Sequence, residues 1–225
     1  IGNQIAEVLI LHQKMRRREA WDRATELLAL VGIPDPARSV RVYPHQLSGG
    51  MRQRAMIAMA LACGPKVLIA DEPTTALDVT IQAQILDLIR QLQDELHTAV
   101  ILITHDLGVI AETAQRVAVM YAGKMAEKAS AQEIFHDPRH PYTQGLLKSL
   151  PRVDASGERG RRLHEISGIV PSLLALPAGC YFHPRCPRRI EICVREEPLM
   201  LPLNGQHEAA CWVAQQEAAH GAAPH

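Results

Sequence analysis

The chain has 225 residues, 24 Lys and Arg against 24 Asp and Glu, and 47% hydrophobic residues. This composition excludes a disordered chain, and the zero net charge argues against a nucleic-acid binder that relies on bulk positive charge. There is no apolar run near the ~20 residues that a membrane-spanning helix needs, and no signal peptide, so a soluble globular chain is expected. Residue 1 is Ile, which predicts a start inside a longer protein.

Helical signals dominate the first 64 residues. Apolar residues at helical spacing predict one helix before the basic run 16–18 and a second helix that stops at Gly32 and Pro34. A third helix is predicted over 51–62, with the Ser48 hydroxyl as its N-cap. It is apolar on much of its circumference, so we expect it to be well buried.

Two short apolar runs, 67–70 and 100–103, predict two fully buried parallel strands joined by a helix over 79–96. This is a βαβ unit, whose parallel strands end at the same edge of the sheet. Ligands bind at that edge in open α/β folds. The polar residues that follow the strands, Asp71-Glu72 and His105, are therefore expected to lie together at a ligand site.

The remainder of the chain changes character. Residues 117–127 predict a β-hairpin and 131–135 a short helix, whereas the stretch from about Pro151 is rich in Pro, Arg and Cys. Few long periodic segments occur there. We accordingly divide the chain into three segments, residues 1–64, 65–150 and 151–225.

Adjacent carboxylates at the end of a buried strand are costly unless they meet a cation or a reacting water. One carboxylate of Asp71-Glu72 can hold Mg²⁺ and the next can polarise an attacking water. His105 can hydrogen-bond a phosphate and that water. Each of these features alone has a simpler explanation. An isolated Asp-Glu pair is more often two solvated side chains, and an isolated His is more often a packed side chain without a catalytic role.

Two further features point to a phosphate ligand. Gly49 and Gly50 at a helix start allow close approach of the backbone, and the helix N-terminus after Ser48 favours an anion. The alternative is a plain N-cap beside a flexible loop. Asp78 either caps the next helix or accepts hydrogen bonds at a subunit contact.

In this order and spacing, the motifs resemble the nucleotide-binding subunit of ABC transporters. LSGGMRQR (47–54) resembles the signature motif, VLIADEP (67–73) the Walker B motif with its catalytic glutamate, TALD (75–78) the D-loop and ITHD (103–106) the H-switch. The resemblance implies ATP and Mg²⁺ as cofactors, with catalytic roles for Glu72 and His105. The cofactor-binding residues that it implies are Ser48, Gly49, Gly50, Gln53, Asp71, which also holds the Mg²⁺, and Asp78.

One departure from that family is large. The phosphate-binding string G-x-x-x-x-G-K-S/T does not occur in this sequence, nor does the glutamine-containing loop that links the two subdomains. The sequence therefore predicts the C-terminal part of a longer subunit whose first βαβ elements precede Ile1. The 225 residues alone are expected to bind no ATP in the normal manner and to be inactive.

The second half resembles one subfamily. Residues 140–151 look like the helix after the ATPase core of peptide importers, and 169–173 and 179–187 resemble the C-terminal extension of oligopeptide, dipeptide and nickel ABC ATPases. The resemblance implies an α/β fold: part of a P-loop NTPase core, a helical subdomain and a Cys-rich extension. It implies the ATP-hydrolysing subunit of a di- or oligopeptide importer. The alternatives are a nickel importer, a soluble ABC ATPase that acts on DNA or ribosomes, and a non-enzymatic fragment that only binds a partner.

The implied partners follow from this assignment. They are a second ATPase subunit, in a homo- or heterodimer, the transmembrane permease subunits and, indirectly, a periplasmic peptide-binding protein. Nucleic acid is not an expected partner. The implied location is peripheral, at the cytoplasmic face of the inner membrane.

Four cysteines, Cys180, Cys186, Cys193 and Cys211, have the spacing C-x5-C-x6-C-x17-C. Four thiolates can hold a 4Fe–4S cluster or tetrahedral Zn²⁺, although the C-x2-C knuckle typical of structural zinc is missing. The peptide importers that this sequence resembles carry an iron–sulfur cluster at a similar set of cysteines. The resemblance therefore makes a cluster the leading prediction. Zinc and four reduced structural cysteines stay open. His183 and His207 could substitute as ligands, but both are expected at the surface.

Overall fold

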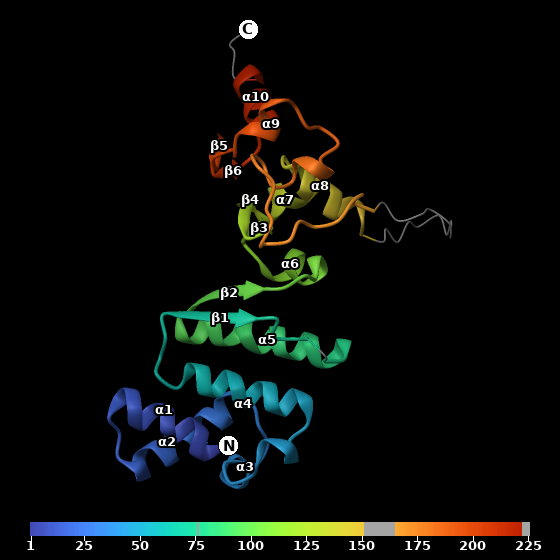
Figure 1. Cartoon of the computed structure of the whole chain (residues 1–225). Coiled ribbons are helices and arrows are strands. Elements are labelled where there is room, and N and C mark those ends of the chain that lie inside the picture. Colours follow the sequence, from blue (N-terminus) through green and yellow to red (C-terminus); the bar gives the residue numbers. More distant parts are fainter. Residues whose placement is uncertain (76, 151–164, 222–225) are drawn as a thin grey trace. The chain divides into compact units, whose positions relative to one another are not determined.

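The computed structural model of the chain describes residues 1–75, 77–150 and 165–221. These residues form two compact units that divide between Leu107 and Gly108 (Figure 1). Ala76 of the TALD motif and the first part of the predicted extension, residues 151–164, lie outside the described residues. Each unit has a core of its own.

The first unit begins with the predicted helices. Helices α1, α2 and α4 pack together through buried side chains that include Leu9, Leu28 and Ala58. The Ser48 hydroxyl caps α4 by accepting a hydrogen bond from the Met51 amide at 3.3 Å, as predicted. The bounds are α1 (Gly2–Gln13), α2 (Arg17–Leu30), α3 (Pro36–Ser39), the 3-10 turn η1 (Pro44–Gln46) and α4 (Gly49–Leu61).

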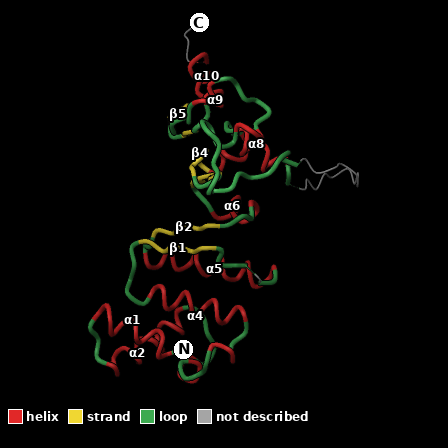
Figure 2. Tube along the Cα trace, viewed as in Figure 1, coloured by secondary structure: helices red, strands yellow, loops and turns green. Residues whose placement is uncertain are grey.

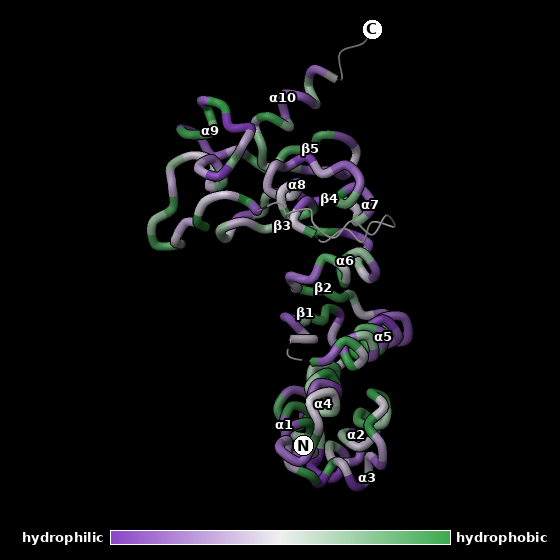
Figure 3. Tube along the Cα trace, turned by 90° about the vertical axis from the view of Figure 1, so that its right-hand side faces the viewer, coloured by the Kyte–Doolittle hydropathy of each residue, from purple (hydrophilic) through white to green (hydrophobic). Residues whose placement is uncertain are grey.

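The predicted βαβ unit is confirmed. Strands β1 (Val67–Asp71) and β2 (Ala99–Ile103) pair in parallel, and α5 (Val79–Leu96) connects them. Helix α5 lies along one face of this pair (Figure 2), and its apolar side joins the core that contains Leu68 and Val100. The hydropathy along α5 alternates accordingly between hydrophobic and hydrophilic (Figure 3).

Full burial of the two strands was a wrong prediction. Their exposure alternates along the chain, and Ile69 and Ile101, which are paired across the strands, have 64% and 51% of their surface exposed. Helix α5 covers one face of the pair, whereas nothing in the described part of the chain buries the face that carries Ile69 and Ile101. The apolar side chains at successive positions of these strands therefore give the strand pair two apolar faces, and α5 covers one of them.

The second unit is built on an antiparallel sheet with the strand order β3-β4-β6-β5. The predicted hairpin is β3 (Arg116–Tyr121) with β4 (Lys124–Ser130), and the predicted short helix is α7 (Ala131–His136). Strands β5 (Leu201–Asn204) and β6 (His207–Ala209) complete the sheet. The other elements are α6 (Leu107–Thr113), α8 (Pro141–Lys148), the turn η2 (His183–Arg185), α9 (Ile192–Arg195) and α10 (Trp212–Gly221).

The pairing of β4 with β6 joins residues from both sides of position 150 in one sheet. The two units consequently do not coincide with the predicted segments 1–64, 65–150 and 151–225. The division into those three segments stays a prediction about how the chain is organised.

A buried hydrogen-bonded network ties this sheet to the loop before α8. Glu127 on β4 and His207 on β6 are 0% and 1% exposed, and their side chains meet at 2.7 Å. The Glu127 carboxylate also accepts hydrogen bonds from the backbone amides of Arg139, at 2.6 Å, and His140, at 3.0 Å. The expectation that His207 lies at the surface is wrong, because β6 is an inner strand of the sheet.

The buried His140 predicts a loss of stability in mild acid. Its Nδ1 accepts a hydrogen bond from the Tyr142 amide at 3.0 Å and so caps α8. Burial lowers the pKa of His140 from 6.5 to about 4, so the folded state holds the ring neutral where the unfolded chain would protonate it. The free energy of unfolding should therefore fall by up to about 3 kcal/mol as the pH drops through this interval.

Urea denaturation between pH 7 and pH 4 measures this effect. The matched variant is His140→Asn, because Asn retains an N-cap acceptor and removes the titrating ring. We expect the stability of the variant to fall less steeply with pH than that of the wild type. Equal slopes in the two proteins would show that His140 does not protonate on unfolding.

Candidate active site

The polar residues that follow β1 and β2 meet, as the parallel arrangement predicts. His105 Nδ1 lies 3.1 Å from Glu72 Oε1. The Glu72 amide donates to the Ile103 carbonyl at 2.9 Å, so Glu72 extends the ladder between the strands by one residue. Its φ of 46° is left-handed, a conformation that is uncommon for residues other than glycine and that is found at functional sites.

A third residue, Thr75, bonds to the Glu72–His105 pair. Thr75 Oγ1 donates a hydrogen bond to Glu72 Oε2 at 2.9 Å. This bond, and secondly the one to His105, lower the pKa of Glu72, so the side chain is a carboxylate at neutral pH. The side chains of Glu72 and His105 are 47% and 79% exposed, which leaves both accessible to a ligand. This role of Thr75 was not predicted, although its position three residues after Glu72 was a signal.

Asp71 is the last residue of β1 and lies exposed beside Glu72. The described residues contain no group of three or more His, Cys, Asp or Glu side chains arranged to hold a metal ion. Magnesium usually takes one or two protein carboxylates and completes its shell with water and substrate phosphates. A single exposed carboxylate such as that of Asp71 would fit this pattern.

The start of helix α5 lies near the carboxyl ends of both strands. Asp78 caps it by accepting a hydrogen bond from the Ile81 amide at 2.9 Å, which is one of the two roles proposed for it. One turn further along, Gln82 Nε2 donates to Asp106 Oδ2 at 3.3 Å. The start of α5 is thereby tied to the residue after His105, a contact that the sequence analysis missed.

The signature residues lie at the start of α4, against the beginning of α5. A Cβ on Gly50 would come within 2.8 Å of Ile81, and one on Gly49 within 3.3 Å of Leu77. The glycines therefore permit close packing of the two helices, in addition to the predicted access to phosphate. Ser48 is exposed and Gln53 is half-buried, and in the described structure neither is hydrogen-bonded to Glu72 or His105.

Comparison with known proteins identifies the family of the chain. The model of the family "ABC transporter" matches residues 3–75, which hold the signature and Asp71-Glu72. The chain belongs to the ABC transporter family. A second model, "Oligopeptide/dipeptide transporter, C-terminal region", matches residues 126–193. The fold is therefore the α/β fold of P-loop NTPases, followed by the C-terminal region of oligopeptide and dipeptide transporters.

Individual relatives of this ABC transporter protein have peptide transport in their names. The chain is 53% identical to the dipeptide transport ATP-binding protein DppD of Bacillus subtilis, over 98% of this chain and 65% of the relative. It is 54% identical to a putative peptide import ATP-binding protein of Brucella melitensis, over 97% and 66%. It is 52% identical to the oligopeptide transport ATP-binding protein OppD of Bacillus subtilis, over 97% and 60%. The chain thus spans about two thirds of the length of these relatives.

The four cysteines of the predicted cluster site lie in the second unit of this ABC protein. Cys180 donates its backbone amide to the Cys193 carbonyl at 2.9 Å. Burial raises the pKa of the Cys180 thiol to about 11, and burial also raises the pKa of Cys186 and Cys211. Neighbouring cysteines raise the pKa of each of these three thiols further, so the four cysteines lie near one another. They do not form a ligating group in the described structure, and the iron–sulfur cluster stays a prediction.

One structural finding concerns the membrane. Across residues 1–75, 77–150 and 165–221, every helix is too short or too polar to cross a bilayer.

Proposed function

We propose that the chain is part of the ATP-hydrolysing subunit of an ABC importer for di- or oligopeptides. The observation that carries this proposal is the hydrogen-bonded Glu72–His105 pair at the edge of two parallel strands, in a chain that also has the signature sequence. The oligopeptide/dipeptide C-terminal region favours a transporter over a soluble ABC ATPase. The names of the compared relatives favour peptides over nickel.

The proposed chemistry assigns one task to each side chain. The Glu72 carboxylate accepts a proton from the water that attacks the terminal phosphate of ATP, since Thr75 and His105 hold it ionised. His105 contacts that phosphate and shares a hydrogen bond with the base. Asp71 holds Mg²⁺, which neutralises phosphate charge when it is bound.

The proposed assembly is a dimer of ATPase subunits. Ser48, Gly49 and Gly50 contact the ATP that a facing subunit holds, with Gln53 and Asp78 alongside. What supports a facing subunit is that, in the described chain, Ser48 bonds to its own helix, and no hydrogen bond joins it to Glu72 or His105. The further partners are the permease subunits and, through them, a periplasmic peptide-binding protein. The subunit is peripheral, at the cytoplasmic face of the membrane.

Ser48→Arg tests this assembly in the full-length subunit. The long cation enters the space that the phosphates need, so we expect ATP-driven dimerisation to be lost, as measured by light scattering in a hydrolysis-deficient background. Met56→Arg is the matched control, because it adds the same charge on the exposed side of α4, where Met56 is 57% exposed. Dimerisation of the Ser48 variant at wild-type ATP concentrations would refute the role of the signature.

We also propose a 4Fe–4S cluster on Cys180, Cys186, Cys193 and Cys211. Binding iron requires the thiols to deprotonate, against the raised pKa values that burial gives them, and to converge further than they do here. Anaerobically purified protein should be brown, with about four irons per chain. Cys186→Ser should bleach it, whereas Cys63→Ser, which changes the fifth cysteine of the chain, in the first unit, should not. One stoichiometric zinc in colourless protein would assign zinc instead, and folded, metal-free protein would mean that the cysteines are structural.

A further inference from the structure

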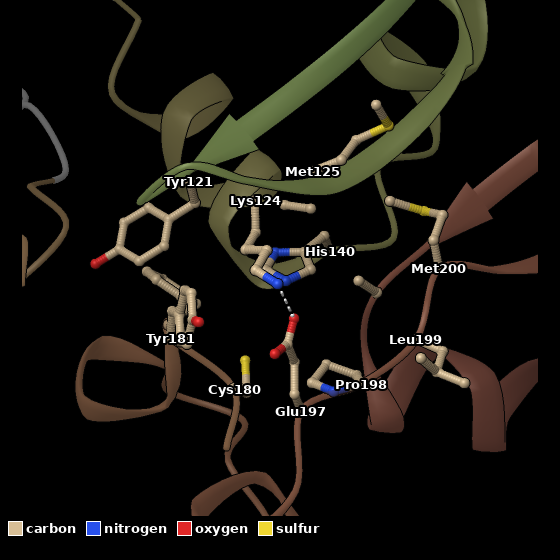
Figure 4. Close-up of a pocket in the computed structure, with 13 residues that line it drawn as sticks. Tyr121, Lys124, Met125, His140, Cys180, Tyr181, Glu197, Pro198, Leu199 and Met200 are labelled. Carbon is tan, nitrogen blue, oxygen red and sulfur yellow. Dashed lines mark ion pairs between the residues drawn. The ribbon is translucent and has the colours of Figure 1, made fainter. Parts of the chain in front are cut away.

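The second unit contains a small cavity of about 250 Å³ that the nucleotide chemistry does not use. It lies between the start of β4, the loop at 180–182 and the segment at 197–200 (Figure 4). Its walls are mainly apolar and aromatic, and include Tyr121, Met125, Tyr181, Phe182, Leu199 and Met200. All of its lining residues belong to this unit.

A cluster of aromatic rings packs behind the cavity and supports its wall. The ring of Tyr121 packs edge-on against Phe182 at a centroid distance of 5.2 Å, and the Tyr142 ring lies 4.7 Å from Tyr121 and 5.4 Å from Phe182. Phe182 is 3% exposed, so the inner wall is fixed in place. The cavity is smaller than the ~300–1,000 Å³ of sites for drug-sized ligands, which limits the ligand to about one apolar side chain with a small head group.

A single ion pair bridges the cavity. Lys124 Nζ, from β4, lies 3.0 Å from Glu197 Oε1, and Figure 4 shows this pair spanning the hollow between the strand and the opposite segment. Both side chains are about half exposed, at 56% and 48%. An exposed pair of this kind contributes only about 0–1 kcal/mol, so a ligand that supplies its own charges can separate it at little cost.

We propose that this cavity binds a free α-amino acid with an apolar or aromatic side chain. Its carboxylate pairs with Lys124, its ammonium group pairs with Glu197, and its side chain fills the aromatic cavity. One ion pair is thus exchanged for two, and the charge of the site stays balanced. An anion alone would leave Glu197 without a partner, and a cation alone would leave Lys124 without one.

The proposal does not rest on the ATPase function, since no residue assigned to the nucleotide lines the cavity. Isothermal titration of the whole 225-residue chain with L-phenylalanine, L-leucine and L-methionine tests it. We expect saturable binding of at least one of the three. N-acetyl-phenylalanine amide, 3-phenylpropionate and phenethylamine carry neither or only one of the charges, and each should bind at least about tenfold more weakly than phenylalanine.

Two variants test whether the amino acid binds through Lys124 and Glu197. Glu197→Gln and Lys124→Gln should each weaken amino-acid binding about tenfold or more. Glu196→Gln is the matched control, because Glu196 is the exposed neighbour that does not line the cavity. Unchanged thermal unfolding would show that each variant is folded. Binding by the Glu197 and Lys124 variants equal to the wild type, equal binding of the neutral analogue, or no saturable binding of any of the three amino acids would overturn the proposal.

Discussion

Replacing Glu72 with Gln in the full-length subunit is expected to lower steady-state ATP hydrolysis by ~10²–10⁴-fold, while ATP binding survives. Gln keeps the shape of the side chain and can still contact His105, which lies 3.1 Å from Glu72. An amide cannot accept the proton of the attacking water. The loss should therefore appear in the rate of phosphate release and not in the affinity for nucleotide.

Phosphate release and nucleotide affinity are measured on the same preparation. Glu95→Gln makes the same chemical change at an exposed position near the end of α5 and should leave the rate unaltered. Hydrolysis by the Glu72 variant near the wild-type rate would show that another group acts as the base. A joint loss of binding and hydrolysis would instead assign Glu72 to nucleotide binding.

Glu127→Ala is expected to cost the second unit ~3–5 kcal/mol of unfolding free energy. The substitution removes the carboxylate that lies 2.7 Å from the buried His207 and accepts the amides of Arg139 and His140. All three groups would lose their buried partner at once. A loss of this size is large compared with the ~5–15 kcal/mol by which domains are usually stable.

The neighbouring Glu208 provides the control. It is about one-third exposed and pairs with Lys128 at 3.7 Å, so Glu208→Ala should change the stability by no more than about 1 kcal/mol. The chain has two tryptophans, Trp21 in the first unit and Trp212 in the second. A Trp21→Phe background therefore lets fluorescence follow the second unit alone during urea denaturation. Equal losses from the two glutamate variants would contradict the role of the buried network.

The site could be predicted from the sequence because a geometric rule applies to it. Two apolar runs separated by a helical stretch indicate parallel strands, and parallel strands end at one edge. This placed Glu72 beside His105 without further information. The same kind of local rule identified Ser48 and Asp78 as helix caps, since a cap bonds to an amide within three residues.

Features that depend on distant parts of the chain could not be predicted. Glu127 and His207 are 80 positions apart, and only the pairing of β4 with β6 brings them together. The exposed face of Ile69 and Ile101 was missed for a related reason. A run of apolar residues indicates that both faces of a strand can be covered. It does not identify the element that covers each face.

ATP hydrolysis at Glu72 is proposed to power peptide import. The most direct test is the uptake of a labelled dipeptide into proteoliposomes that contain the full-length subunit and its permease partners, with phosphate release measured in parallel. We expect peptide to stimulate hydrolysis, and Glu72→Gln to abolish uptake and hydrolysis together. Peptide uptake that persists in the Glu72 variant, or hydrolysis that proceeds in the wild type without any uptake of peptide, would show that hydrolysis at Glu72 does not drive import.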